Sequence, residues 1–519
     1  MKITGALKNI YKKTPLFVLF IGIYPSLTLL VWNMRETDVI VVLRPLIFSM
    51  TIMLIACMLC YGIIRQWPKS FLISSVFAIF FFSFGHISIF IDASSVYRKA
   101  GEPSWIIDAL LPTLYLSAML LLIRSIIKHK SGFDNIYSAL NTASTILMLF
   151  PLFFILYNYS SRNVASENNQ QGIQLQPEEN TLLPDVYYII LDTYGRHDSL
   201  MSLGYDNSYF IKELEDIGFY VAACSRSNYP QTTVSMASSL NMGYLWDVIP
   251  NTGSGDRNSE PVYAGIIHSQ VRQEFEDRGY RIVAFDSGVR WLNWRDADLF
   301  IEPTPDTFFS LQLSVFEYIF LDTTAIHPFM QQPYFLRSKY VHNYNRILFV
   351  LDELPRLAKV KGPKFVYVHM LIPHPPNIFL ADGSMNLDTD YYNFGIGKGK
   401  NGQYNIEGYI NNTKFINSRL PDVVRDIIKY SDKPPVIIIQ GDHGYQLPDI
   451  QHYILNAYYL PNENISYPYP TITPINTFRI VFNNYFGTNY PLLDDKSLDV
   501  GISRPYGKKL AQINPKKCP

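Results

Sequence analysis

Two apolar stretches of the chain end on residues that commonly bind metal ions. Residues 184–195 read PDVYYIILDTYG, and their apolar run stops at Asp192. Residues 434–444 read PPVIIIQGDHG, a second run of the same kind that stops at Asp442 and His443. Continuous β-branched and aromatic runs of this length are typical of strands buried on both faces of a parallel sheet.

The position of these polar residues at strand ends favours one shared site. In open α/β sheets, ligands bind outside the carboxyl ends of the strands, so side chains placed there point toward a ligand. Taken alone, Asp192 has a plainer explanation, which is that its carboxylate only caps the loop that follows. A second strand that ends on Asp442 and His443 favours a site assembled between the two tips.

A pair of threonines at a predicted helix start offers a nucleophile. In SNYPQTTVSMASSLNMGYL, residues 227–245, Pro230 ends an extended segment and a helix is predicted from Val234 onward. Thr232 and Thr233 sit where that helix starts. One of them serves as the N-cap in the plain interpretation. In the alternative, a hydroxyl at a helix N-terminus that faces a cation attacks an anionic ester.

Further polar residues follow other predicted strands. His369 and His374 lie in KFVYVHMLIPHPPNIF, where they are either ordinary loop residues or part of the same site. Asp286 and Arg290, in AFDSGVRW, could line the same crevice, and His452 is a weaker candidate for a ligand or substrate contact.

Composition excludes some classes of protein. The 519 residues carry 44 basic and 44 acidic side chains, so the formal charge is zero and nothing favours a nucleic acid partner. Hydrophobic residues make up 48% and charged residues only 17%, and the apolar excess lies in the first third. The four cysteines form neither a disulfide framework nor a zinc pattern.

That first third contains five apolar runs long enough to cross a hydrocarbon core, which needs about 20 helical residues. Basic residues are concentrated before the first run and in every second connection, which by the positive-inside rule puts the N-terminus in the cytoplasm. An odd number of spans then puts the rest of the chain on the outer face. The runs cover residues 15–33, 43–63, 71–92, 105–125 and 141–158.

The remainder of the chain predicts an α/β domain. Residues 159–182 are polar and form a linker between a transmembrane domain, 1–158, and an extracytoplasmic domain, 183–519. Strand and helix patterns alternate after the linker, which indicates βαβ crossovers and a mostly parallel sheet sandwiched by helices. The predicted strands are 185–191, 219–224, 280–285, 364–371 and 435–440, and the predicted helices are 206–217, 233–242, 262–278, 338–357 and 406–430.

The order of these motifs resembles the alkaline phosphatase and sulfatase superfamily. With five amino-terminal spans in front, the resemblance is to the membrane-anchored branch of lipoteichoic acid synthases and of phosphoglycerol and phosphoethanolamine transferases. It implies that Asp192, Asp442, His443 and the nucleophile oxygen hold one divalent ion, Mn²⁺, Zn²⁺ or Mg²⁺. A family glycine ten residues after the nucleophile, matched here by Gly243, implies Thr233 as nucleophile and metal ligand, with Thr232 as runner-up.

The same resemblance implies roles for the histidines and a reaction. His374, with His369, would bind the substrate phosphate, and His374 would protonate the leaving oxygen. The expected activity is transfer of a phospho-head-group from a phospholipid, or another anionic ester, to an envelope glycan or lipid through a phospho-threonine intermediate.

Three departures from the family keep alternatives open. VSMA follows Thr233, so the sequence that sulfatases convert to formylglycine is missing and sulfate ester hydrolysis is disfavoured. No extra histidine follows closely after His443, which favours one metal over two. The transferases often have glutamate where this chain has Asp192. A sulfatase-like hydrolase or phosphodiesterase, and a binding protein with a decayed site, are therefore the alternatives.

Overall fold

The computed structural model describes residues 13–34, 37, 39–93, 104–130, 132–167, 183–249, 259–303, 313–388, 405–461, 468–501 and 503–511. The chain divides into two compact units. Unit 1 comprises Met1–Ile173 and Asp306–Lys339, and unit 2 comprises Gln174–Pro305 and Tyr340–Pro519. The domain boundaries at residues 158 and 183 stay predictions. The structure adds a feature that they do not contain, because the segment Asp306–Lys339 belongs with the amino-terminal helices.

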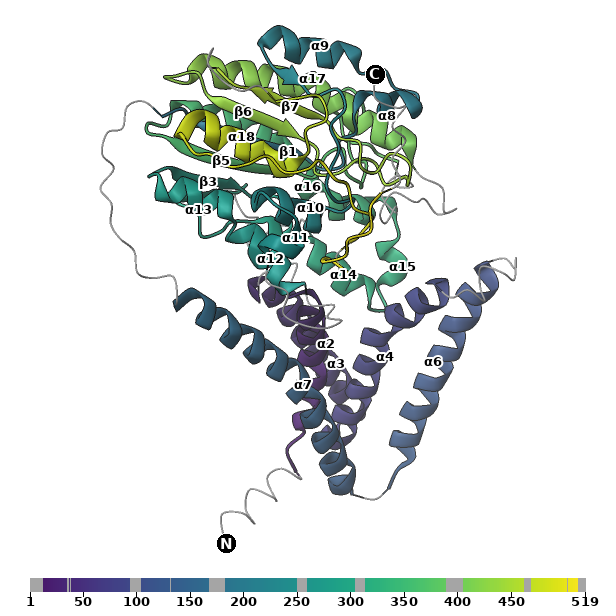
Figure 1. The fold of residues 1–519 in the computed structure, drawn as a ribbon. Helices are drawn as coiled ribbons and strands as arrows, with labels where there is room; N and C mark the ends of the chain where they lie inside the picture. Colours follow the sequence, from purple (N-terminus) through teal and green to yellow (C-terminus); the bar gives the residue numbers. More distant parts are fainter. Residues whose placement is uncertain are drawn as a thin grey trace. The chain divides into compact units, whose positions relative to one another are not determined.

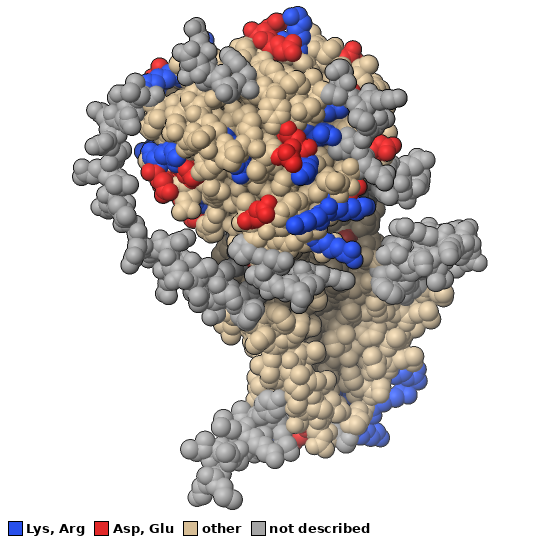
Figure 2. Space-filling model, viewed as in Figure 1, with Lys and Arg blue, Asp and Glu red and all other residues tan. Residues whose placement is uncertain are grey.

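Unit 1 contains long helices (Figure 1). Among the described residues, four helices are long and apolar enough to cross a membrane, and they overlap four of the five predicted runs. The run predicted at 105–125 lies in a fifth helix, α6, which is not among these four. Charged side chains are sparse over this unit in the view of Figure 2. The helices are α2 (Leu16–Asn33), α3 (Leu43–Ile64), α4 (Trp67–Ala93), α6 (Ser104–Lys128) and α7 (Asp134–Glu167), with η1 (Val39–Val42) before α3.

Unit 2 is organised around a seven-stranded sheet with the order β2-β7-β6-β1-β5-β3-β4. The five strands from β6 to β4 run parallel, whereas β7 and β2 add an antiparallel edge. The predicted fold class, helices followed by an α/β domain with a mostly parallel sheet, is therefore confirmed. The strands are β1 (Val186–Leu191), β2 (Tyr220–Val221), β3 (Arg281–Phe285), β4 (Leu299–Ile301), β5 (Lys364–Met370), β6 (Val436–Gln440) and β7 (Asn456–Tyr459).

The central strand β1 is buried on both faces because its alternate side chains enter two separate cores. Tyr187, Ile189 and Leu191 pack in one core with residues of α9, α16 and α17. The intervening side chains pack in the other core with residues of α10, α12, α13 and α18. The helices are α8 (His197–Ser202), α9 (Ser208–Ile217), α10 (Thr232–Leu240), α11 (Leu245–Val248), α12 (Glu260–Ile267), α13 (Gln270–Asp277), α16 (Pro333–Glu353), α17 (Ile406–Tyr430) and α18 (Pro474–Phe486), with η2 (Arg290–Leu292) and η3 (Leu354–Lys359).

Most predicted elements lie where the pattern indicates, and one helix differs for a clear reason. The helix predicted at 262–278 is two helices, α12 and α13. Ser269 interrupts it, because its side chain accepts the backbone N–H of Arg272 and so caps the start of α13. The helix predicted at 406–430 matches α17, which begins after the capping side chain of Asn405.

The cysteines differ in state between the two units. Cys57 and Cys60 in α3 are free thiols, whereas Cys224 in unit 2 is disulfide-bonded. The prediction that the cysteines form no disulfide framework is therefore wrong for Cys224, because a disulfide requires only that two cysteines lie close in space, which their spacing along the chain does not reveal. Disulfides persist in oxidising compartments, so this bond is evidence about the compartment in which unit 2 lies.

Candidate active site

Three adjacent strands bring the candidate ligands together at the carboxyl end of the sheet. β1 lies between β6 and β5, and all three run parallel. Asp192 directly follows β1, and Asp442 and His443 follow β6. His369 is the last but one residue of β5 and is in register with Ile190 of β1. The two strand tips singled out in the sequence therefore meet, and a third strand contributes an imidazole.

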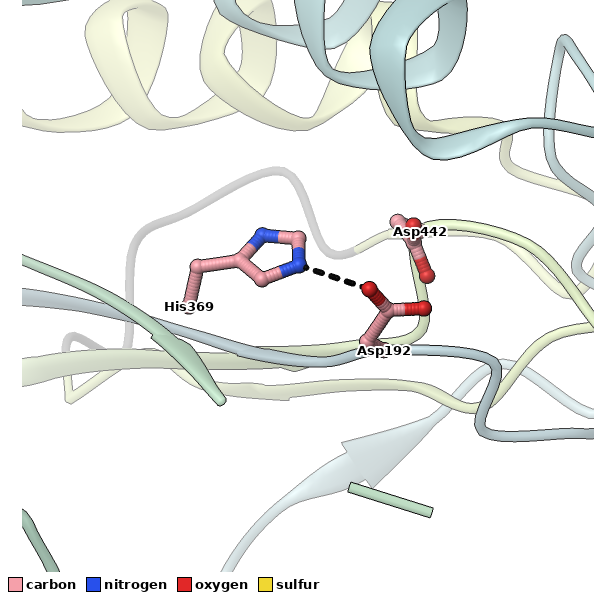
Figure 3. Close-up of side chains that lie close together, drawn as sticks. All are labelled: Asp192, His369 and Asp442. Carbon is pink, nitrogen blue, oxygen red and sulfur yellow. Dashed lines mark hydrogen bonds and ion pairs between the residues drawn. The ribbon is translucent and has the colours of Figure 1, made fainter. Parts of the chain in front are cut away.

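The side chains of Asp192, His369 and Asp442 face one another (Figure 3). Their ligand atoms lie within 4.8 Å of one another. Nε2 of His369 is 3.1 Å from Oδ2 of Asp192. Nε2 of His443 is 3.6 Å from Oδ2 of Asp442 and 4.0 Å from Oδ1 of Asp192. All four residues are at most 2% exposed, so water does not screen their charges.

Within the part of the chain that the structure describes, two carboxylate oxygens in this cluster have no hydrogen-bond donor. Oδ1 of Asp192 and Oδ2 of Asp442 are buried without a partner among these residues, as is Nδ1 of His369. A buried charged oxygen without a partner is destabilising, and native proteins almost always satisfy such atoms. Ligand atoms that bind a metal ion tetrahedrally at 2.0–2.2 Å lie roughly 3.3–3.6 Å from one another. The distance from Nε2 of His443 to Oδ2 of Asp442, 3.6 Å, is close to this range. The residues therefore fit a divalent cation.

Neighbouring groups hold the histidine His443 and the aspartate Asp192 in the protonation states that metal binding requires. Nδ1 of His443 lies 2.8 Å from the carbonyl of Gly444, which fixes the proton on Nδ1 and leaves the lone pair of Nε2 pointing into the cluster. Burial raises the pKa of Asp192, but the imidazoles of His374 and then His369 outweigh burial and lower that pKa to about 2. Asp192 is therefore ionised at neutral pH, as a metal ligand must be.

The backbone after β1 holds the second carboxylate in place. The N–H of Thr193 donates to Oδ1 of Asp442 at 2.9 Å, which leaves Oδ2 as the free oxygen. Thr193 has a φ of 65°, a left-handed conformation that is uncommon for threonine. The hydroxyl of Ser235 in α10 donates to the backbone carbonyl of Asp442 at 2.6 Å. The start of α10 is thereby tied to the loop that carries the ligands.

That tie brings Thr232 to the cluster. Its Oγ1 lies 3.3 Å from Nε2 of His443. The N-cap position of α10 is occupied by Gln231, so neither threonine is the N-cap. The hydroxyl of Thr233, the nucleophile predicted from the glycine spacing, makes no hydrogen bond in the part of the chain that the structure describes. Its role stays a prediction.

The two histidines predicted to bind substrate differ in their surroundings. His369 is fully buried against Asp192, so the structure gives it contacts with the candidate metal ligands. His374 is partly buried, its backbone N–H donates to the carbonyl of Asp192 at 3.1 Å, and its Nδ1 contacts the carbonyl of Pro375. Because the carbonyl of Pro375 occupies Nδ1, Nε2 is the other ring atom of His374 that can take part in proton transfer.

Three weaker candidates from the sequence have other partners. The carboxylate of Asp286 accepts from Arg346 at 2.7 Å and from Asn293 at 2.6 Å. Arg290 begins the short helix η2 that follows this loop. Nε2 of His452 lies 3.1 Å from Oδ1 of Asp499, close to the end of the described chain. Asp286 and His452 are therefore occupied in fastening loops, a role that the sequence does not reveal because each partner is distant along the chain.

Comparisons with known proteins give structural matches only. No protein-family model matches the chain, and no curated protein matches it. The C-terminal periplasmic domain of EptC from Escherichia coli matches with 10% identity and a TM-score of 0.39, covering 64% of this chain and 93% of that one. The lipooligosaccharide phosphoethanolamine transferase A from Neisseria meningitidis matches with 12% identity and a TM-score of 0.34, covering 86% and 88%.

An alkaline phosphatase superfamily protein from Vibrio parahaemolyticus also matches, with 12% identity, a TM-score of 0.35 and coverage of 63% of this chain and 79% of that one. Because identities are this low and TM-scores are below 0.5, function is argued below from this chain's own residues. The solved structures that the chain is similar to thus include phosphoethanolamine transferases and a protein of the superfamily that its motifs resemble.

Proposed function

We propose that this protein is a membrane-anchored, metal-dependent transferase that moves a phospho-head-group from a lipid donor to an envelope glycan or lipid through a phospho-threonine intermediate. The observation that carries the proposal is a threonine hydroxyl 3.3 Å from an imidazole that borders two buried carboxylates with unpartnered oxygens. A hydroxyl held beside a cation-type site can act as a nucleophile toward an anionic phosphodiester.

In this proposal Asp192, Asp442 and His443 hold one divalent ion, and Thr232 lies beside it. The bound ion would supply positive charge that lowers the pKa of the threonine hydroxyl and offsets the charge of the phosphoryl oxygens. His369 positions Asp192 through the 3.1 Å contact between Nε2 and Oδ2. Thr233 is the alternative nucleophile.

Two transfer steps complete the reaction. First, Oγ1 of Thr232 gives its proton to solvent water and forms a bond to the donor phosphorus, while the bond from phosphorus to the diacylglycerol oxygen breaks. The imidazolium form of His374 gives that leaving oxygen the proton on Nε2. Second, an acceptor hydroxyl gives its proton to Nε2 of His374 and bonds to the same phosphorus, the bond from phosphorus to Oγ1 of Thr232 breaks, and that oxygen takes a proton from solvent water. Water in place of the acceptor would make the protein a phosphodiesterase.

Two observations support an outward-facing catalytic unit. The basic residues near the N-terminus favour a cytoplasmic start, and the disulfide at Cys224 is typical of an oxidising compartment such as the periplasm or the cell exterior. Apolar helices in unit 1 would hold the active site beside lipid donors and so raise their effective concentration.

The test uses purified full-length protein and fluorescent phosphatidylethanolamine or phosphatidylglycerol. We expect wild-type protein loaded with Zn²⁺ or Mn²⁺ to release fluorescent diacylglycerol and Thr232→Ala to release none. Thr233→Ala is the matched control, one position along the same helix, and should stay active. Full activity in both alanine variants would contradict a covalent threonine mechanism, and loss only in Thr233→Ala would assign the nucleophile to Thr233.

A further inference from the structure

The segment between β4 and the middle of α16 packs with the long helices of unit 1. It contains α14 (Val315–Asp322), α15 (His327–Met330) and the start of α16, and it belongs to unit 1 although it is flanked on both sides by strands of unit 2. We call the described residues 313–334 the surface segment.

The surface segment packs tightly against α3 and α4. Phe320 is 2% exposed, and its ring lies 6.1 Å from that of Phe82 in a cluster that includes Met53 and Ala78. Gly85 of α4 makes the approach possible, because a Cβ there would lie 2.1 Å from the backbone oxygen of Asp322. The fit depends on a residue with no side chain and is therefore specific.

Polar contacts fix the same segment. The N–H of Ala325 donates to the carbonyl of Phe81 at 2.7 Å. Nε of Arg44, in the first turn of α3, lies 3.0 Å from Oε1 of Glu317, which is 6% exposed. Glu317 also closes a capping box with Ser314 at the start of α14. These contacts involve the beginning of α3 and the second half of α4, toward one end of these two helices.

Large apolar side chains remain exposed at that end. Phe329 and Tyr334 of the surface segment are 65% and 74% exposed. Trp32 at the end of α2 is 74% exposed and Ile40 of η1 is 69% exposed. Trp and Tyr are enriched where transmembrane helices meet the headgroup layer, because their rings are apolar and carry one polar group. The exposed side chains continue the apolar surface of helices long enough to span a bilayer.

We propose that the surface segment lies in the headgroup layer of the bilayer crossed by α2, α3 and α4, with Phe329 and Tyr334 inserted among the lipids. The inference rests on these helices crossing a membrane and not on the proposed reaction. The lipid bilayer is the occupant favoured by the continuity of the exposed apolar side chains with the spanning helices.

The position of the segment in the chain gives this contact a consequence. α16 starts in the surface segment at Pro333 and continues into unit 2, where its Arg346 binds Asp286 at the carboxyl end of β3. Unit 2 would thus be attached to the membrane through α16 as well as through the chain that follows α7.

The test measures the depth of a nitroxide label in full-length protein, reconstituted in nanodiscs of phosphatidylethanolamine and phosphatidylglycerol. Labels are placed at Phe329→Cys and, as an independent site, at Tyr334→Cys, in a background with Cys57 and Cys60 replaced by alanine. Leu54→Cys, 57% exposed on α3, gives the value for the bilayer interior, and free label gives the value for water.

For each label we compare its accessibility to oxygen with its accessibility to a water-soluble nickel complex. We expect the ratio of the two to lie between the bilayer-interior and water reference values at both sites. Water-like ratios at both sites would overturn the proposal. It would also be overturned if protection from the nickel complex depended on protein concentration instead of lipid, because a second copy would then be the occupant. One water-like site with the other lipid-like would refute insertion of the segment as a unit.

Discussion

Replacing Asp442 by asparagine should stabilise the metal-free protein. Asp192 and Asp442 belong to a group whose ligand atoms lie within 4.8 Å of one another, and each has a buried oxygen that accepts from no donor among the described residues. The amide would remove one charge, keep an oxygen for the N–H of Thr193 and supply a donor to the facing carboxylate. A hydrogen bond to a charged group contributes about 1.5–3 kcal/mol, so we expect the free energy of unfolding to rise by about 2 kcal/mol.

The same substitution should remove the effect of metal. A ligand present at 1,000 times its Kd stabilises the protein that binds it by about 4 kcal/mol. The unfolding entropy of a unit the size of unit 2 is roughly 0.6 kcal/mol/K, so this stabilisation corresponds to a rise in Tm of about 6 °C. Asp442→Asn should lose most of this rise, because a neutral amide replaces an anionic ligand.

Thermal unfolding of the detergent-solubilised full-length protein, after chelation and after addition of Zn²⁺, measures both effects. Asp449→Asn is the matched control, since Asp449 is exposed on the loop that follows the same strand. It should keep the wild-type response. The reasoning is refuted if Asp442→Asn gains as much Tm from Zn²⁺ as the wild type, or if its metal-free form unfolds more easily.

Two further predictions concern packing and pH. Gly85→Val should release the surface segment from α4 and abolish hydrogen-exchange protection of the Ala325 amide. Gly62→Val is the control, because a Cβ at Gly62 meets no described atom, and it should leave that amide protected. Equal protection in both variants would contradict the packing of the surface segment against α4. Burial raises the pKa of Asp286, but Arg346 outweighs burial and lowers it. The resulting stability should be present above the unfolded pKa and be lost as pH falls through the folded one. Denaturant unfolding between pH 7 and pH 3 should show this loss in wild type and little of it in Arg346→Met, which should be about 2 kcal/mol less stable at pH 7.

The sheet and its two acidic tips could be predicted because local sequence determines them. The β-branched runs before Asp192 and Asp442 are long enough to require burial on both faces, and the residue that ends each run must lie at the carboxyl edge. Which strands are neighbours is a long-range property. The proximity of His369 to Asp192 depends on β5 pairing with β1 in one register, and no local pattern encodes that register.

Other features of the site lie beyond what spacing alone can predict. A helix start is uncertain by a residue or two in a sequence pattern, and that margin separates Thr232 from Thr233.

The attachment of the surface segment to α3 and α4 depends on contacts between Phe320 and residues more than 200 positions earlier, such as Phe82. From composition, the segment is indistinguishable from another helix of the α/β domain.

Peptide-level mass spectrometry tests the central claim most directly. Full-length protein loaded with Zn²⁺ is incubated with phosphatidylethanolamine in the absence of an acceptor, digested and sequenced across α10. We expect a phosphoethanolamine adduct on the hydroxyl of Thr232, absent after chelation and absent in Asp442→Asn. An unmodified α10 in protein that is releasing diacylglycerol would contradict it.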